Sequence, residues 1–133
     1  MLVNESILRW LVTNAGATLQ SLTMPNIPLL RSQIVPLRLP QLTHLSLTDP
    51  EDLTSAKLRA FGASPLQSFD VIAEVQTPAL LERLREFLVL HQSTLNCVHA
   101  RFWCRKEEEK GHLLLDIEKL CLDNKVAFTV LYS

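Results

Sequence analysis

The sequence has little glycine, few cysteines and no excess of charge of one sign, and each shortage argues against a class of protein. With three glycines in 133 residues, it contains no glycine-rich phosphate-binding or oxyanion loop. Three cysteines are too few, and odd in number, for a disulfide framework, so we expect a reducing compartment, the cytoplasm or the nucleus. A formal net charge of -1 lacks the basic footprint of a protein that binds nucleic acid, and we expect none as a partner.

Long hydrophobic runs are also missing. No apolar run approaches the roughly 20 residues that span a bilayer, so we expect no membrane segment. The N-terminal stretch MLVNESILRWLVTNAGA ends in small residues, as signal peptides do, but Asn4, Glu5 and Arg9 interrupt it and no basic segment precedes it. We therefore expect an intracellular protein that is not secreted. Hydrophobic residues make up 47% and charged residues 20% of the chain, which is typical of a single folded domain, here residues 1–133.

A six-residue motif with apolar residues at its fourth and sixth positions recurs along the chain. The copies are LQSLTM, LTHLSL, LQSFDV, LNCVHA and the weaker KVAFTV, at residues 19–24, 42–47, 66–71, 95–100 and 125–130. All but the last begin with leucine, and successive copies start 23, 24, 29 and 30 residues apart. The alternation predicts five strands, and the regular spacing predicts a repeat architecture.

Between these strands the apolar residues take helical spacing. Thr77 and Pro78 suit an N-cap and a first turn, and Leu81, Leu84 and Leu88 follow on one stripe. The same reasoning predicts a helix that starts at Asp49 and Pro50, buries Ala60 and Phe61 and stops at Gly62. Further helices are expected around Ile7–Val12, at Asn26–Val35 and at Leu113–Leu122, where Cys121 is expected to act as a small buried hydrophobe.

The resulting order, a helix and a strand repeated about five times, fits two architectures. In a doubly wound α/β domain both sheet faces are buried, so the strands are continuous apolar runs. Here polar residues such as His44, Ser46, Ser68 and Asp70 interrupt the strands at alternate positions. One face should therefore meet water or a partner. We predict an α/β solenoid arc of about five α–β units, with a parallel sheet on the concave side and helices on the convex side.

The phrases LPQLTHLSL, SPLQSFDV and DIEKLCLDNKVAFTVLYS resemble leucine-rich repeats, whose period is 20–29 residues. In particular, they are similar to the divergent repeats of fungal F-box/leucine-rich-repeat proteins, and the resemblance covers about 17–133. It implies a leucine-rich-repeat solenoid and a role in substrate recognition for an F-box-type ubiquitin-ligase adaptor. No segment is similar to an F-box, so it implies a recognition portion or a truncated relative. The asparagine that usually follows the strand motif is replaced, so we expect irregular turns at Ile27, Pro50, Glu74 and Trp103.

The concave side of such a solenoid carries the third, fifth and seventh residues of each motif, in rows with about 4.8 Å between neighbours. These positions define a candidate binding face for a protein partner, with no cofactor. It consists of His44, Ser46, Ser68, Asp70, Cys97, His99 and Arg101.

Ser46, Asp70 and His99 are the residue types of a hydrolase triad. In a triad the histidine lies between nucleophile and carboxylate, whereas here Asp70 would separate Ser46 from His99. We therefore expect no enzyme, and we interpret Asp70 and His99 as a hydrogen-bonded pair on a polar face. A small hydrolase that uses Asp70 and His99 is an alternative.

Two further clusters have plain interpretations. Cys97, His99 and Cys104 lack the spacing of a second ligand pair, so we expect no metal site. After the fourth strand, Phe102 and Trp103 are expected to cover a turn. Because tryptophan and arginine are common at interface hot spots, the alternative is a rim contact formed by Phe102, Trp103 and Arg105.

The last strand motif lies close to Ser133, and the sequence offers no evident cover for the final sheet edge. Uncovered strand edges pair with other chains. We therefore expect homo-oligomers that form through uncapped sheet edges. A free-standing repeat fragment that associates with itself is a further alternative for the function.

Overall fold

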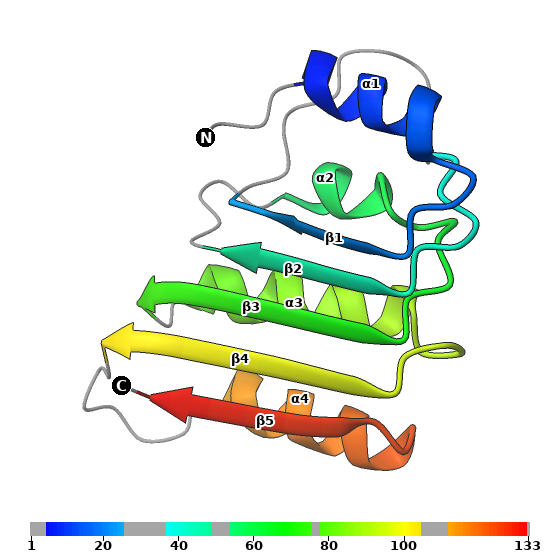
Figure 1. The fold of residues 1–133 in the computed structure, drawn as a ribbon. Coiled ribbons are helices and arrows are strands. Elements are labelled where there is room, and N and C mark those ends of the chain that lie inside the picture. The colour runs from blue at the N-terminus through cyan, green and yellow to red at the C-terminus, as the bar shows by residue number, and fades with distance from the viewer. Residues whose placement is uncertain (1–4, 26–36, 49–53, 76–77, 105–111, 133) are drawn as a thin grey trace.

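The computed structural model describes residues 5–25, 37–48, 54–75, 78–104 and 112–132. Helices and strands alternate among the described elements, except that β2 follows β1 (Figure 1). The elements are α1 (Glu5–Ala15), β1 (Ser21–Met24), β2 (His44–Thr48), α2 (Ser55–Arg59), β3 (Ser68–Val75), α3 (Pro78–Leu90), β4 (Cys97–Cys104), α4 (His112–Asp123) and β5 (Ala127–Tyr132).

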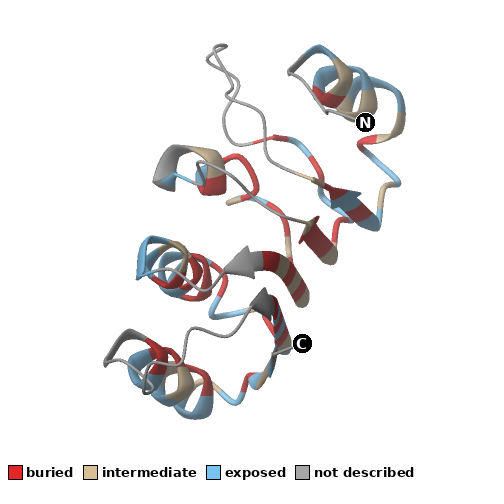
Figure 2. Cartoon of the chain, turned by 90° about the vertical axis from the view of Figure 1, so that its left-hand side faces the viewer, coloured by how far each residue is buried: buried red, intermediate tan, exposed pale blue. Residues whose placement is uncertain are grey.

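The five strands form one sheet in the order β1-β2-β3-β4-β5, and every neighbouring pair is parallel. The prediction of an α/β protein with a five-stranded parallel sheet is therefore confirmed. Helices α2, α3 and α4 pack on one face of this sheet, and α1 lies beyond β1 (Figures 1 and 2). The opposite face carries no described helix, and we call it the open face.

Alternating side chains explain why the strands bury one face only. In β1, Leu22 and Met24 are buried whereas Ser21 and Thr23 are exposed. The buried positions continue across the sheet and meet the apolar stripes of the helices, so the core lies between sheet and helices (Figure 2). Its strand residues include Leu45, Leu47, Phe69, Val71, Val98 and Ala100.

Helices α3 and α4 follow the predicted stripes. Leu81, Leu84 and Leu88 of α3 are buried, and Pro78 is its first residue, where a missing N–H costs nothing. Leu114, Ile117 and Cys121 form the same stripe on α4 and are likewise buried. The rings of Phe69 in β3 and Phe87 in α3 lie 4.0 Å apart at 58°, a tilted contact that joins sheet and helix.

The strands enter the sheet in a repeated way. The carbonyl of Gln20 accepts hydrogen bonds from the backbone N–H groups of Thr43 and His44, at 3.0 and 3.1 Å. The carbonyl of Thr43 accepts hydrogen bonds from the N–H groups of Gln67 and Ser68 in the same way. The carbonyl of Gln67 accepts them from the N–H groups of Asn96 and Cys97. These shared carbonyls fix the stagger of successive strands, so equivalent motif positions stand side by side.

Some expected boundaries differ. Helix α2 begins at Ser55, and its N-cap is Thr54, whose hydroxyl oxygen accepts a hydrogen bond from the N–H of Lys57 at 3.3 Å. It ends at Arg59 with Ala60 as its C-cap, and Gly62 does not adopt a positive φ, so the glycine is not needed as a stop. The predicted starts at Asp49 and Thr77 and the helix at Asn26–Val35 lie outside the described residues.

Strands β3 and β4 continue beyond their motifs. They end at Val75 and Cys104, so Glu74 and Trp103 lie in extended strands and not in the irregular turns that the missing asparagines suggested. Nothing in the sequence at these positions stops the ladder between β3 and β4. None of the described helices is long and apolar enough to cross a membrane.

Candidate binding face of the sheet

The strand registers place the predicted face residues in rows on the open face. One row runs Ser21, His44, Ser68, Cys97 and Ala127. The next runs Thr23, Ser46, Asp70, His99 and Thr129, and a third places Arg101 between Ile72 and Leu131. The alignment of motifs in the sequence gave these same neighbours, because each strand starts from an equivalent turn.

Accessibility varies within the rows. His99 and Arg101 are exposed, and His44, Ser68, Asp70 and Cys97 are partly exposed. Ser46 is only 8% exposed, although no described helix covers it. Its side chain is short and stands between two occupied strands, so its neighbours screen it from water. Ser46 therefore contributes to the floor of the open face and offers little surface to a partner.

Asp70 is paired with His44 and not with His99, which corrects the sequence-based pairing. Nε2 of His44 lies 3.2 Å from Oδ2 of Asp70. His44 is the diagonal neighbour of Asp70 on β2, whereas His99 stands directly opposite it on β4. Alignment of equivalent positions identifies direct neighbours only, and the long imidazole side chain reaches the diagonal one.

One oxygen of the Asp70 carboxylate has no hydrogen-bond donor among the described residues. Its second oxygen, Oδ1, is buried and accepts no hydrogen bond from the described residues. A buried acceptor without a donor is costly, on the order of 1–3 kcal/mol. The centre of the open face therefore contains an acceptor that is shielded from water and from a partner.

A second polar contact lies beside this pair. The thiol of Cys97 donates to the hydroxyl oxygen of Ser68 at 3.4 Å. Cys97 is a free cysteine, partly exposed on the open face. Together the two contacts make a small polar patch, His44, Asp70, Ser68 and Cys97, across β2, β3 and β4.

The register does not assemble a hydrolase triad from the three candidate residues. Asp70 stands between Ser46 and His99, as expected from the order of the strands. A base must lie between the nucleophile and the carboxylate, so these three side chains are not arranged for that chemistry. In the described part of the chain, no three histidine, cysteine or acidic side chains gather as a possible metal site.

For Phe102 both the expected turn cover and the alternative rim contact are wrong. Its side chain is fully buried on the helix-facing side of β4, because β4 continues as a strand through this segment. Phe102 is thus a core residue and neither covers a turn nor contacts a partner. The side chain of Trp103 and the whole of Arg105 lie outside the described residues.

Two buried polar groups belong to the helix side of the molecule. His91, which follows α3, is 2% exposed, and its ring lies 4.6 Å from that of Phe87. Burial lowers the pKa of His91 to about 4, against the opposing effect of its hydrogen bond to the Ser64 backbone. In α4, burial and then the nearby Glu118 raise the pKa of the Cys121 thiol to about 11, as suits a cysteine that acts as a small hydrophobe.

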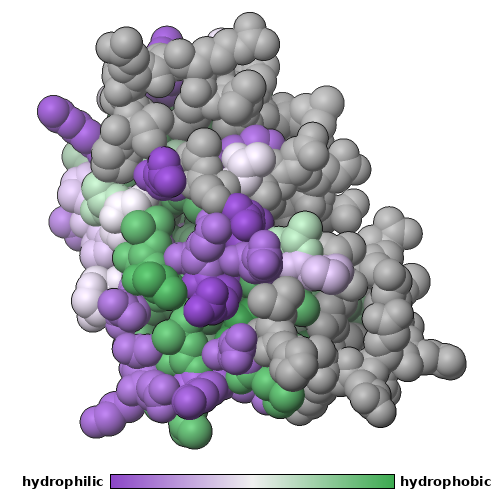
Figure 3. Space-filling model, turned by 180° about the vertical axis from the view of Figure 1, so that it is seen from behind, coloured by the Kyte–Doolittle hydropathy of each residue, from purple (hydrophilic) through white to green (hydrophobic). Residues whose placement is uncertain are grey.

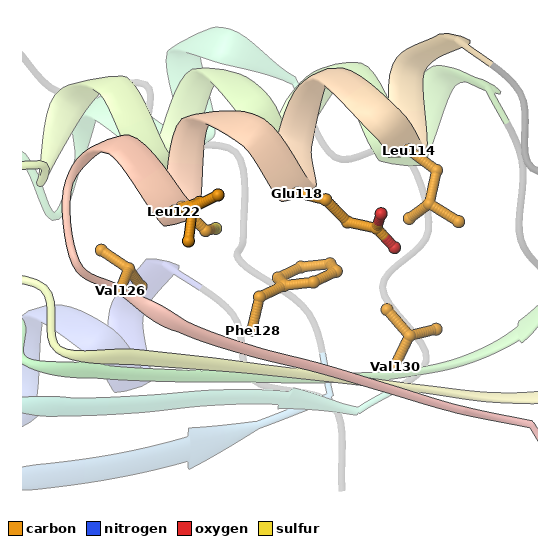
Figure 4. A pocket seen from close by; sticks show the side chains of 7 residues that line it. Leu114, Glu118, Leu122, Val126, Phe128 and Val130 are labelled. Carbon is orange, nitrogen blue, oxygen red and sulfur yellow. The ribbon is translucent and has the colours of Figure 1, made fainter.

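A third feature is an open cleft of about 370 Å³ between α4 and β5 (Figure 4). Leu114 lies over Val130, Glu118 over Phe128, and Leu122 over Val126. Viewed from the helix side, hydrophilic side chains cover much of the described surface, with apolar patches between them (Figure 3). The cleft was not predicted from the sequence, where Leu122 was only the last residue of the helix expected at Leu113–Leu122.

No family model, curated protein or solved structure matches this chain. The geometry of the sheet and of its two surfaces therefore carries the functional argument.

Proposed function

We propose that this protein is a protein–protein interaction module of the leucine-rich-repeat type, which binds its partner on the open face of the sheet. The observation that carries this proposal is the one-sided packing of the helices. A five-stranded parallel sheet is normally covered on both faces, whereas here one face carries polar rows and no described helix.

The polar rows suit recognition. Short side chains at fixed spacing along parallel strands give a regular surface, and repeat proteins use such surfaces to bind extended or helical segments. Arg101 and His99 are exposed and provide donors, and the partly exposed carboxylate of Asp70 provides an acceptor.

The test is quantitative affinity capture from cell lysate with the wild type and an Asp70→Ala, His99→Ala, Arg101→Ala variant. A matched control carries Glu82→Ala, Arg85→Ala and Gln92→Ala, three exposed polar residues of α3 and the turn after it. We expect specific partners to be lost with the first variant and kept with the control. Equal recovery with the wild type and the open-face variant would show that this face is not the site.

The resemblance to F-box/leucine-rich-repeat proteins extends the proposal to the recognition of substrates for ubiquitination. In that role a captured partner carries ubiquitin, and its abundance rises when this protein is depleted from the cell. Both can be measured by mass spectrometry of the captured partners. A partner whose modification and abundance do not respond would leave a binding module without this role.

A further inference from the structure

We propose that two copies of this chain associate through α4 and β5 into a closed dimer with two-fold symmetry. The surface concerned is the outer side of the last α–β unit, which lies at the opposite end of the sheet from α1 (Figure 1). It is separate from the open face, so the proposal does not rest on the proposed function.

The internal interfaces of the molecule indicate what kind of element covers such a surface. The outer side of α3 and β4 is covered by α4 and β5, through a parallel strand and a packed helix. On the outer side of α4 and β5 the described residues place nothing, and the apolar cleft lined by Leu114, Phe128 and Val130 is left open there (Figure 4). A strand and a helix of a second copy would therefore fit this surface.

The exposed side of α4 is complementary to itself. Leu115, Glu118, Lys119 and Leu122 lie at positions i, i+3, i+4 and i+7, within an arc of about 100° around the helix. Leu115 is 49% exposed and Leu122 is 78% exposed, both unusual for leucine. In an antiparallel pair with its axis between residues 118 and 119, Leu115 meets Leu122 of the second copy and Glu118 meets its Lys119. Apolar groups thus face apolar groups, and opposite charges face each other.

The edge of β5 can pair about the same axis. The N–H of Ala127 donates to the carbonyl of Asn96, toward β4, so the backbone groups of Phe128 and Val130 point the other way. These outward groups have no strand beside them among the described residues. An antiparallel contact centred on Phe128 pairs this residue with itself and places the N–H of Val130 opposite the carbonyl of Val126 in the second copy, because the N–H of Val126 already donates to the carbonyl of Cys121.

The two layers agree on the position of the axis, and this agreement carries the inference. Glu118 lies over Phe128 in the cleft, so a line perpendicular to the sheet through the middle of the helix stripe meets β5 near Phe128, the second residue of the strand (Figure 4). Strands about 4.8 Å apart and helices about 8–10 Å apart would continue the packing found inside the molecule.

The other end of the molecule has a helix in place of an open cleft. Leu8 of α1 is fully buried, and Leu11 and Val12 pack against the core, so α1 covers the helix side of the β1 end. A contact between two identical surfaces is isologous, and such a contact closes at the dimer. Because the axis is perpendicular to the sheet, both open faces lie on the same side and form one continuous surface of doubled length.

The experiment measures the mass of the purified chain by light scattering over a roughly hundredfold range of concentration, where mass action reveals a dimer. We expect the wild type to change from monomer to dimer, and Leu122→Glu, which alters both halves of the interface, to weaken the dimer by about tenfold or more. Trp10→Glu, at an exposed position of α1, is the control and should leave the dimer unchanged.

A charge exchange tests the proposed axis. Lys119→Glu alone places like charges opposite each other and should weaken the dimer, whereas Glu118→Lys combined with Lys119→Glu should restore it. Slower hydrogen exchange at the amides of Phe128 and Val130 in the dimer than in the monomer would verify the strand pairing. A monomer at every concentration, growth beyond the dimer, loss of the dimer with Trp10→Glu, or no rescue by the exchange would each overturn the proposal.

Discussion

His91 combines a titratable ring with an almost completely buried position. Its ring donates a hydrogen bond to the Ser64 backbone, while Nε2 and the hydroxyl of Ser64 are buried without a partner among the described residues. Such a site accepts the neutral imidazole and disfavours the imidazolium, because a buried charge without a counter-ion loses its hydration. The folded state therefore depends on His91 staying neutral.

This dependence predicts a specific loss of stability in mild acid. The pKa of His91 is lowered from 6.5 to about 4 in the folded protein. Its contribution is fully present above about pH 6.5 and is lost progressively as the pH falls toward 4, because the unfolded chain takes up the proton first. The loss should amount to on the order of 3 kcal/mol, measured as the free energy of unfolding in urea between pH 7.5 and 4.

The variant His91→Asn tests the cause of that loss. Its amide can still donate to the Ser64 backbone but does not titrate, so the protein should be less stable at neutral pH and less sensitive to acid. His99→Gln, at an exposed position, is the control and should keep the wild-type profile. If the free energy of unfolding of His91→Asn falls with pH as steeply as that of the wild type, other groups cause the acid sensitivity.

At the scale of the element, the end of α4 shows how a helix leads into the next strand of the sheet. The N–H of Lys125 donates to the carbonyl of Leu122 at 3.2 Å, and that of Val126 donates to the carbonyl of Cys121 at 2.8 Å. This is the hydrogen-bond pattern of a Schellman motif, with Lys125 at the left-handed position at φ 58°. A residue with a Cβ is strained there, where glycine is not.

We therefore expect Lys125→Gly to stabilise the protein by about 0.5–1 kcal/mol, since the relief of strain exceeds the added entropy of the unfolded chain. The measurement is the free energy of unfolding at pH 7. The matched control is Lys119→Gly, the same change in the middle of α4, which should destabilise the protein by about 1 kcal/mol. Destabilisation by both variants would contradict the strain argument.

The helix starts depend on the same local rules but were harder to predict. Asp49 and Pro50 form a good start signal, yet the described helix α2 is capped by Thr54, five residues further on. Both residues are competent caps, and the sequence does not rank them. The packing of Leu58 and Ala60 into the core fixes the turn of α2 that Thr54 caps.

At the scale of the whole molecule, stability should decrease from the central strands toward the ends. β3 and β4 have a strand on each side and the longest ladder, whereas α1 is anchored by one fully buried residue, Leu8. Elements at the ends of a sheet have fewer packed neighbours than central ones, so they open first.

Hydrogen exchange measured by mass spectrometry can test this gradient. We expect the slowest exchange in β3 and β4, and faster exchange in α1. The comparison should be made at low concentration, so that any dimer contact of β5 is absent. Equal protection of α1 and β3 would show that the molecule opens as a single unit.

The resemblance of the five motifs to each other allowed most of the sheet to be predicted. Equivalent turns impose equivalent registers, so the rows through Ser68 and Asp70 could be derived by aligning the motifs. Aligning the motifs does not show how far a long side chain extends. For that reason the pairing of His44 with Asp70 was missed. Phe102 was misplaced because nothing local distinguishes a turn from a continuing strand.

The sequence by itself determined the class of fold and which face of each strand is apolar, because both follow from local periodicity and from the spacing of the motifs. Only the tertiary structure decided which polar atoms find partners, where Ser46 is screened, and how α4 and β5 enclose an open cleft. Those features depend on side chains from several units that meet in space, and distances between such side chains are not encoded in the period of any one segment.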